Sequence, residues 1–144
     1  MKTVYLAGKY LDKEIIKEIA EKIKQKGFEI TAEWYNDTEL PREEGKDWYD
    51  NPEVYTRFIR DFCAIDKSDI FILYSGDGMY LCGALIELGM AYVFDYDSNV
   101  RMKKLFQKSQ RKRFIVVGAS ISDSVLFYPV TEKYATVEQM LEKL

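Results

Sequence analysis

The chain has 144 residues, of which 47% are hydrophobic and 31% are charged, and its net charge is −3. This balance suits one globular domain spanning residues 1–144, and the negative charge gives no reason to expect a nucleic-acid partner. Histidine is absent, which excludes Ser-His-Asp triads, Cys-His dyads and HExxH zinc sites. If the chain is an enzyme without a metal, carboxylates must supply the nucleophile and transfer the protons.

The first 34 residues predict a strand, a helix and a second strand. Residues 3–6 (TVYL) are a short apolar run, and residues 28–34 (FEITAEW) alternate apolar and polar side chains as a strand does. Between them, apolar residues recur at helical spacing up to a stop at Lys26 and Gly27: Ile15, Ile16, Ile19, Ala20 and Ile23. This order opens an α/β fold with a parallel sheet.

Residues 35–51 are polar and acidic and predict a long loop. Asn51 and Pro52 then predict a helix start, with Asn51 as the N-cap and Pro52 as the first helical residue. The helix ends near Lys67, and its apolar face carries Phe58, Phe62 and Ile65. Two cysteines without a CxxC motif, Cys63 and Cys82, fit reduced thiols in a cytosol rather than a zinc site or disulfides.

The second half of the chain predicts two buried strands, at residues 69–74 (DIFILY) and 114–117 (FIVV). Between the strands, a glycine-rich turn leads into a helix that starts near Gly83. Residues 93–113 either extend this helix or form a separate helical excursion, and their basic end, 103–113, predicts a solvated helix face. The closing helix lies within residues 136–144 and begins with a capping box formed by Thr136 and Gln139.

This order of elements is typical of a doubly wound, mainly parallel, flavodoxin- or Rossmann-like sheet. Ligands of such sheets bind outside the carboxyl ends of the strands. The segments predicted at that edge are residues 7–9, 34–35, 75–78 and 118–120. Residues 76–78 (GDG) lack the third glycine of a dinucleotide fingerprint and indicate a turn, so no cofactor is expected there.

Glu87 lies in an otherwise apolar run, residues 81–92 (LCGALIELGMAY). Because helical side chains tilt toward the N-terminus, a residue one turn into this helix would point back at the ligand edge. A plainer interpretation is a carboxylate at the rim of the apolar face, paired with a lysine. Gly89 costs about 1 kcal/mol in a helix interior relative to alanine, which suggests close packing against the sheet or a second subunit.

Asp61 lies on the preceding helix, three residues after Phe58 and four before Ile65. This places it at the edge of the buried face, where a carboxylate is costly unless it is paired or used. Its plainer interpretation is a salt bridge with one of three nearby cations, Arg57, Arg60 or Lys67.

Three stretches resemble the nucleoside 2-deoxyribosyltransferase family: TVYLAGKY, RDFCAIDKSDIFILYSGDG and CGALIELGMAY. The family's pattern has YxAG after the first strand, two aspartates spaced D-x7-D before the third, and G-x3-ELG-x-A opening the following helix. The spacing of Asp61, Asp69 and Glu87 fits this pattern without a gap. The resemblance includes Trp34 and covers nearly the whole chain apart from residues 93–113.

The resemblance implies that Glu87 is the nucleophile at C1′ of a 2′-deoxyribonucleoside and that Asp61 protonates the departing base. It implies that Tyr5 orients Glu87, and that Gly8 and Gly83 let the backbone approach the substrate. The expected substrate-binding residues are Ala7, Gly8, Trp34, Ser75, Asp77 and Gly83. A pair of carboxylates can carry out this reaction without a cofactor, as in retaining glycosidases.

Leu81 departs from the family's pattern. Transferases of the family usually carry an aspartate there, which contacts the sugar hydroxyls, and related nucleotide N-glycosidases can carry a serine that helps to bind the 5′-phosphate. An aliphatic side chain can do neither, so Asp77 or Ser75 in the preceding turn would have to substitute.

The leading hypothesis is therefore transfer of 2-deoxyribose between nucleobases, through a covalent deoxyribosyl–glutamate. The expected partners are a nucleoside or nucleotide, a free nucleobase and further copies of the chain as a homo-oligomer. No apolar run approaches the ~20 residues that span a bilayer, so a cytoplasmic protein without a membrane partner is expected. Three alternatives remain open: an N-glycoside hydrolase, a nucleotide-binding module with weak catalysis, and a phosphate-binding enzyme using Lys9 and the basic segment.

Overall fold

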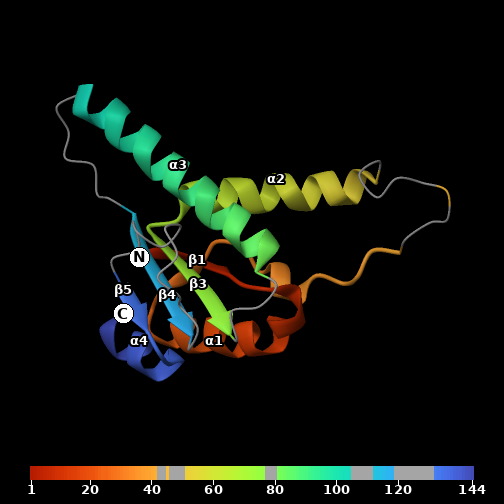
Figure 1. Ribbon diagram of the computed structural model, residues 1–144, viewed down its shortest axis with the longest axis horizontal. Helices are drawn as coiled ribbons and strands as arrows, with labels where there is room; N and C mark the ends of the chain where they lie inside the picture. The colour runs from red at the N-terminus through yellow and green to blue at the C-terminus, as the bar shows by residue number, and fades with distance from the viewer. Residues whose placement is uncertain (42–44, 46–50, 77–80, 105–111, 119–131) are drawn as a thin grey trace.

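A single parallel sheet forms the centre of the computed structural model, which describes residues 1–41, 45, 51–76, 81–104, 112–118 and 132–144 (Figure 1). Its strand order, β2-β1-β3-β4-β5, is the flavodoxin order, and every pair is parallel. The strands are β1 (Thr3–Ala7), β2 (Glu29–Ile30), β3 (Ile70–Gly76), β4 (Arg113–Gly118) and β5 (Glu132–Tyr134). The predicted doubly wound α/β fold is thereby confirmed.

Helices cover both faces of this sheet (Figure 1). They are α1 (Lys13–Gln25), α2 (Pro52–Lys67), α3 (Cys82–Lys104) and α4 (Val137–Lys143), with short 3-10 turns η1 (Tyr10–Asp12) and η2 (Trp34–Asn36). One buried cluster joins α1 and α4 to the sheet, and a second joins α2 and α3 to its other face. Among the described residues, no helix is both long and apolar enough to cross a membrane.

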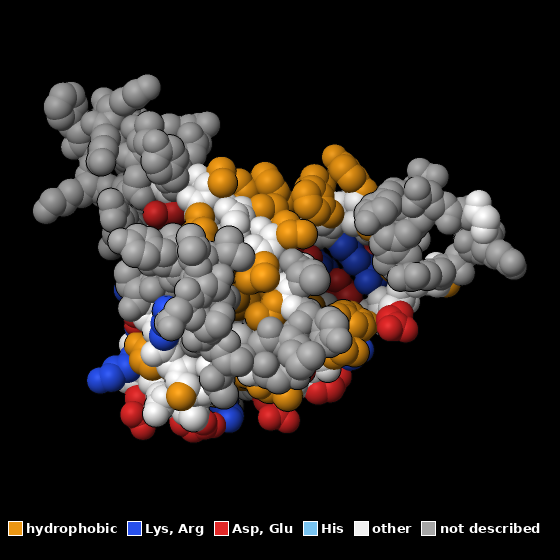
Figure 2. Space-filling model, in the orientation of Figure 1, with side chains coloured by type: hydrophobic (Ala, Val, Ile, Leu, Met, Phe, Trp, Pro, Cys, Tyr) orange, Lys and Arg blue, Asp and Glu red, His pale blue; other side chains and the backbone are white. Residues whose placement is uncertain are grey.

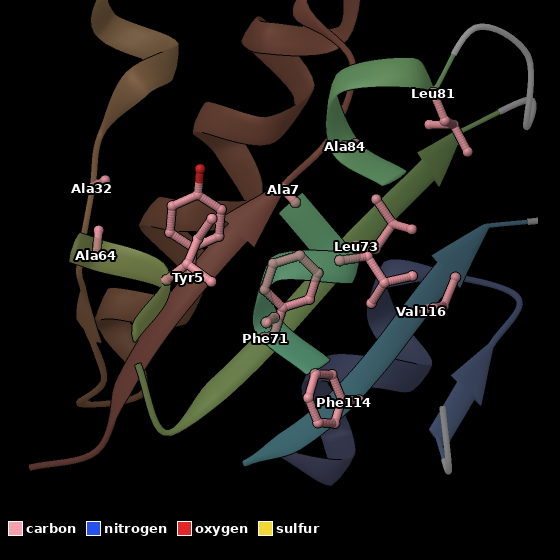
Figure 3. Packing of buried hydrophobic residues seen from close by; sticks show 13 residues of the cluster. Tyr5, Ala7, Ala32, Ala64, Phe71, Leu73, Leu81, Ala84, Phe114 and Val116 are labelled. Carbon is pink, nitrogen blue, oxygen red and sulfur yellow. The ribbon is translucent and has the colours of Figure 1, made fainter. Parts of the chain in front are cut away.

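The alternation of side chains along β1 places Tyr5 on the α2–α3 side. Val4 and Leu6 belong to the cluster under α1, whereas Tyr5 and Ala7 belong to the other cluster. The Tyr5 ring stacks against Phe71 of β3 with its centroid 5.7 Å away, and both are fully buried (Figure 3). Tyr5 therefore carries its hydroxyl toward the helices that hold Glu87 and Asp61.

The predicted helix ends are confirmed where the structure describes them. The Asn51 side chain accepts a hydrogen bond from the Glu53 N–H at 2.9 Å, with Pro52 as the first residue of α2. Thr136 and Gln139 form the predicted capping box of α4. These caps satisfy N–H groups that the first turn of a helix leaves unpaired.

The basic segment differs from its prediction. α3 extends to Lys104, which confirms the predicted extension of this helix over residues 93–104, whereas residues 105–111 lie outside the described part of the chain. Lys112 precedes β4 and donates from Nζ to the carbonyl oxygens of Ile65, at 2.7 Å, and Ser68 at the end of α2. Arg113 in β4 pairs with Glu132 of β5. A solvated helix face is therefore wrong for Lys112 and Arg113, because helix carbonyls and a neighbouring strand bind them.

The second strand is shorter than predicted, because only Glu29 and Ile30 pair with β1. Trp34 instead begins η2, and its indole N–H donates to the Leu6 carbonyl at 2.8 Å. This contact turns the chain in toward the end of β1, which a regular edge strand would not do. β5 at the opposite edge was not predicted, because its three residues carry no alternating apolar pattern.

Two side chains of α2 that were predicted on its buried face, Phe58 and Phe62, lie outside the core. Phe58 is 51% exposed and Phe62 is 37% exposed, whereas Ile65 is fully buried. α2 packs beside α3, where the rings of Phe62 and Phe94 meet edge to face with their centroids 4.7 Å apart. The outer apolar residues of α2 therefore remain uncovered. Gly89 is also exposed, and a Cβ there would contact nothing within 4 Å. Close packing of Gly89 on the sheet is therefore wrong, and packing against a second subunit stays a prediction.

Gly118→Ala and Gly89→Ala should change the free energy of unfolding in opposite directions. Gly118 has φ +139° and an added Cβ would lie 3.0 Å from backbone atoms of Gly76, so alanine should destabilise by more than about 1 kcal/mol. Gly89→Ala should stabilise a single chain by up to about 1 kcal/mol, because the helix gains propensity without a clash inside that chain. Urea unfolding measures both, and equal effects would contradict this description of the two sites.

Candidate active site

A cavity of about 370 Å³ lies at the carboxyl edge of the sheet, where doubly wound folds bind ligands. Segments after β1 and β2 form one wall, and α2 and α3 form the other. The lining residues are Gly8, Lys9, Tyr10, Trp34, Asp37, Arg57, Asp61, Gly83, Ala84 and Glu87. Figure 2 shows acidic and basic side chains gathered in a hollow below α2. The cavity therefore combines a tryptophan, two cations and three carboxylates.

Glu87 is fixed by a hydrogen bond from Tyr5. The Tyr5 hydroxyl donates to Glu87 Oε1 at 2.9 Å, across 82 positions of sequence. The pKa of Glu87 is raised to about 7, mainly by burial and to a smaller extent by the nearby charge of Asp61. The hydrogen bond from Tyr5 opposes this rise. Burial and then the Glu87 charge raise the pKa of Tyr5 well above its usual value, so it remains a hydroxyl donor. Among the described residues, no hydrogen bond reaches Glu87 Oε2.

Asp61 faces the same cavity from α2. Arg60 Nε donates to Asp61 Oδ1 at 2.8 Å, so the salt bridge predicted as the plainer interpretation exists together with a position in the cavity wall. Burial raises the pKa of Asp61, while the hydrogen bond and the charge of Arg60 oppose that rise. The structure thus brings Tyr5, Asp61 and Glu87 together from β1, α2 and α3.

Three of the other predicted site residues line the cavity: Gly8, Trp34 and Gly83. The hydrogen bond from Trp34 to the Leu6 carbonyl fixes the indole at the wall. At Gly8, a Cβ would lie only 2.4 Å from Ile16 Cδ1, so glycine lets α1 pack close to the site. Gly83 is exposed and an added Cβ would meet nothing within 4 Å.

Ala7 and Ser75, two further predicted residues, do not line the cavity. Ala7 is fully buried in the core cluster, and the Ser75 hydroxyl donates to the Val117 carbonyl at 3.0 Å. Asp77 lies outside the described residues. Leu81 is 7% exposed and belongs to the buried cluster below α3, so its side chain packs in the core rather than facing the cavity (Figure 3).

Several cavity residues were not predicted as site residues, most importantly Asp37 and Arg57. Arg57 lies four residues before Asp61 on α2, and this i, i+4 spacing on one helix face was a usable signal. Asp37 had no such signal, because its position depends on η2, which turns the chain after Trp34. Within the described part of the chain, no three cysteine, aspartate or glutamate side chains are grouped to hold a metal ion.

The fold and the cavity define a flavodoxin-like α/β protein with a carboxylate-lined cavity at the carboxyl edge of its sheet. No family model and no curated protein sequence matches this chain. Solved structures do match over almost its full length. A 2-deoxyribosyltransferase from Bacillus psychrosaccharolyticus has 16% identity and a TM-score of 0.62, and the match covers 96% of this chain and 90% of that one.

Two further solved structures have the same fold. The CMP N-glycosidase BcmB of Clostridium botulinum has 20% identity and a TM-score of 0.56, covering 99% of this chain and 97% of its own. A conserved protein of Enterococcus faecalis V583 has 15% identity and a TM-score of 0.60, and the match covers 99% of this chain and 96% of that one. The resemblance that the motifs indicate is thus confirmed in the fold.

Glu87→Gln should stabilise the protein at neutral and higher pH. A glutamate whose pKa rises from 4.5 to about 7 on folding binds more protons when folded, so stability is lost as pH rises through that window. Glutamine removes this loss and can still accept from Tyr5, so at pH 8 the gain should be about 1–3 kcal/mol. Urea unfolding at pH 4.5 and pH 8 measures it.

The matched control is Glu14→Gln, which removes one carboxylate from an exposed position on α1. A gain from Glu87→Gln that is equal at both pH values, or no larger than that of the control, would contradict a raised pKa of Glu87 in the folded protein.

Proposed function

We propose that the protein cleaves the N-glycosidic bond of 2′-deoxyribonucleosides and transfers the sugar to a second nucleobase. The observation that carries this proposal is the pair Glu87 and Asp61, which line one cavity from two helices, with Tyr5 bonded to Glu87. The fold shared with a 2-deoxyribosyltransferase and a CMP N-glycosidase supports it.

In the first half-reaction, Glu87 Oε2 attacks C1′ and forms a glycosyl ester as the bond from C1′ to the base nitrogen breaks. Asp61 gives its proton to the departing base, which leaves neutral. In the second half-reaction, the incoming base attacks C1′, its proton passes to Asp61, and Glu87 is released as a carboxylate. Two inversions at C1′ retain the configuration of the nucleoside.

This mechanism needs Glu87 ionised and Asp61 protonated in the same complex. Burial raises the pKa of both groups, which favours the proton on Asp61 but opposes ionisation of Glu87. Positive charge develops at C1′ in the transition state, next to Glu87. This charge stabilises the carboxylate form of Glu87 during the attack. Tyr5 keeps one carboxylate oxygen bound throughout, which leaves the other to react.

Product chromatography with 2′-deoxynucleosides and their 5′-monophosphates, with and without a second free base, tests the proposal. We expect base exchange, with much slower base release when no acceptor is added. Glu87→Ala should abolish both, and Asp61→Ala should lower the rate about 10²–10⁴-fold for poor leaving groups and less for good ones. Release at the same rate without an acceptor would assign hydrolysis instead, and no product from any donor would exclude the proposal.

We further propose that the protein works as a homo-oligomer joined through the outer faces of α2 and α3. Apolar side chains repeat there at helical spacing, and Figure 2 shows them gathered along these helices. The exposed ones are Tyr55, Phe58, Ile59 and Phe62 on α2 and Ile86 and Val93 on α3. Contiguous exposed apolar surface of this kind marks protein interfaces.

Ile86→Lys should convert the oligomer to monomers, because a buried ammonium at the contact would be costly. Light scattering after size-exclusion chromatography measures the mass. Ile15→Lys on α1, at an exposed apolar position on the opposite side of the sheet, is the matched control and should leave the mass unchanged. A monomeric parent protein, or an Ile86→Lys oligomer, would contradict this interface.

A further inference from the structure

Arg60 forms an ion-pair clamp that joins Asp61 to Asp37. Its Nη1 and Nη2 atoms donate to the two carboxylate oxygens of Asp37, each at 2.8 Å, and its Nε donates to Asp61 Oδ1, also at 2.8 Å. The Asp37 contact is the two-pronged geometry that gives arginine its directional strength. One guanidinium therefore ties the segment after η2 to a carboxylate in the cavity wall.

We propose that Arg60, anchored by Asp37, is a positioning residue that fixes the Asp61 carboxyl through one oxygen and tunes its acidity for proton transfer to the base. This inference rests on the proposed function and concerns its acid. Asp37 in turn sets the orientation of the guanidinium. Because Asp37 binds Nη1 and Nη2, Nε remains to donate to Asp61.

The chemistry of the guanidinium decides which oxygen of Asp61 carries the proton. Arginine can only donate hydrogen bonds, so Oδ1 must act as an acceptor toward Nε. The acidic proton of Asp61 therefore belongs on Oδ2, to which no hydrogen bond runs from any other described residue. During base departure the proton moves from Oδ2 to the base nitrogen, and Arg60 then stabilises the carboxylate left behind.

Charged groups from the surrounding elements face Asp61, and Lys9, after β1, lines the same cavity. On α2, Arg60 and then Arg57 lower its pKa, whereas Asp37, after η2, raises it. Across the cavity, Asp61 raises the pKa of Glu87 on α3 and of Tyr5 on β1, so like charges face it from that side. Arg60 is therefore the main opposition to burial, which favours the protonated acid.

The clamp predicts opposite effects on the pKa of Asp61 for substitutions of its other two members, Arg60 and Asp37. Arg60→Gln removes a hydrogen bond and a positive charge, so the pKa of Asp61 should rise. Asp37→Asn removes a negative charge and leaves Arg60 to pair with Asp61 alone, so that pKa should fall. A purely structural role for Arg60 and Asp37 would not give opposite signs. Arg60→Lys keeps the positive charge but loses the two parallel hydrogen bonds to Asp37, so it should shift the pKa of Asp61 less than Arg60→Gln does.

Carbon-13 NMR titration of aspartate side-chain carboxyls tests this in the intact protein, with Asp61 assigned by its loss in Asp61→Asn. Lys67→Gln is the control, since it removes the same charge from the last turn of α2, next to the opposite edge of the sheet. Upward shifts in Arg60→Gln with downward shifts in Asp37→Asn support the clamp. Shifts of the same sign, no shift, or an equal shift in Lys67→Gln overturn it.

Kinetics with the same variants connect the clamp to catalysis. Arg60→Gln should lower kcat/KM at least about tenfold for poor leaving groups and change it little for good ones, because only the former need a well-placed acid. An equal loss for both kinds of donor overturns the positioning role. The titration needs no turnover, so if no deoxynucleoside reacts with the parent protein, the proposed function fails while the NMR shifts still decide whether Arg60 controls Asp61.

Discussion

The hydrogen bond from Tyr5 to Glu87 links the fold to the site. It exists because β1 alternates its side chains across the sheet and because α3 starts at the carboxyl edge, one turn before Glu87. Burial of a carboxylate there is costly, and the raised pKa of Glu87 reports that cost. The buried ring of Tyr5, stacked on Phe71, provides a rigid support that delivers one hydroxyl to this carboxylate.

The walls of the cavity are fixed by contacts outside the pair Glu87 and Asp61. Trp34 is tied to the β1 backbone, Gly8 lets α1 approach, and Arg60 joins α2 to the segment after η2. The Trp34 and Arg60 contacts link segments distant in sequence, and together with Gly8 they fix the walls that hold the two carboxylates. In the proposed reaction, such preorganisation would let fixed dipoles and charges act on the transition state without rearranging.

Much of the fold could be predicted from the sequence because its signals are local. The apolar run of β3, the helical spacing in α1 and the caps at Asn51 and Thr136 need no knowledge of distant contacts. The outward position of Phe58 was not predictable, because periodicity shows an apolar face but not what covers it. Asp37 was missed for a similar reason, since its place depends on an indole bonding to a strand 28 positions away.

A covalent sugar on Glu87 is the central claim, and its direct test is mass spectrometry of an acid-quenched, protease-digested reaction. A 2′-fluoro-2′-deoxy donor suits the experiment, because fluorine disfavours positive charge at C1′ and slows release of the intermediate. The account predicts one added fluorodeoxyribosyl group on the peptide that contains Glu87, absent in Glu87→Gln. Base release without any adduct, or an adduct on a different residue, would contradict it.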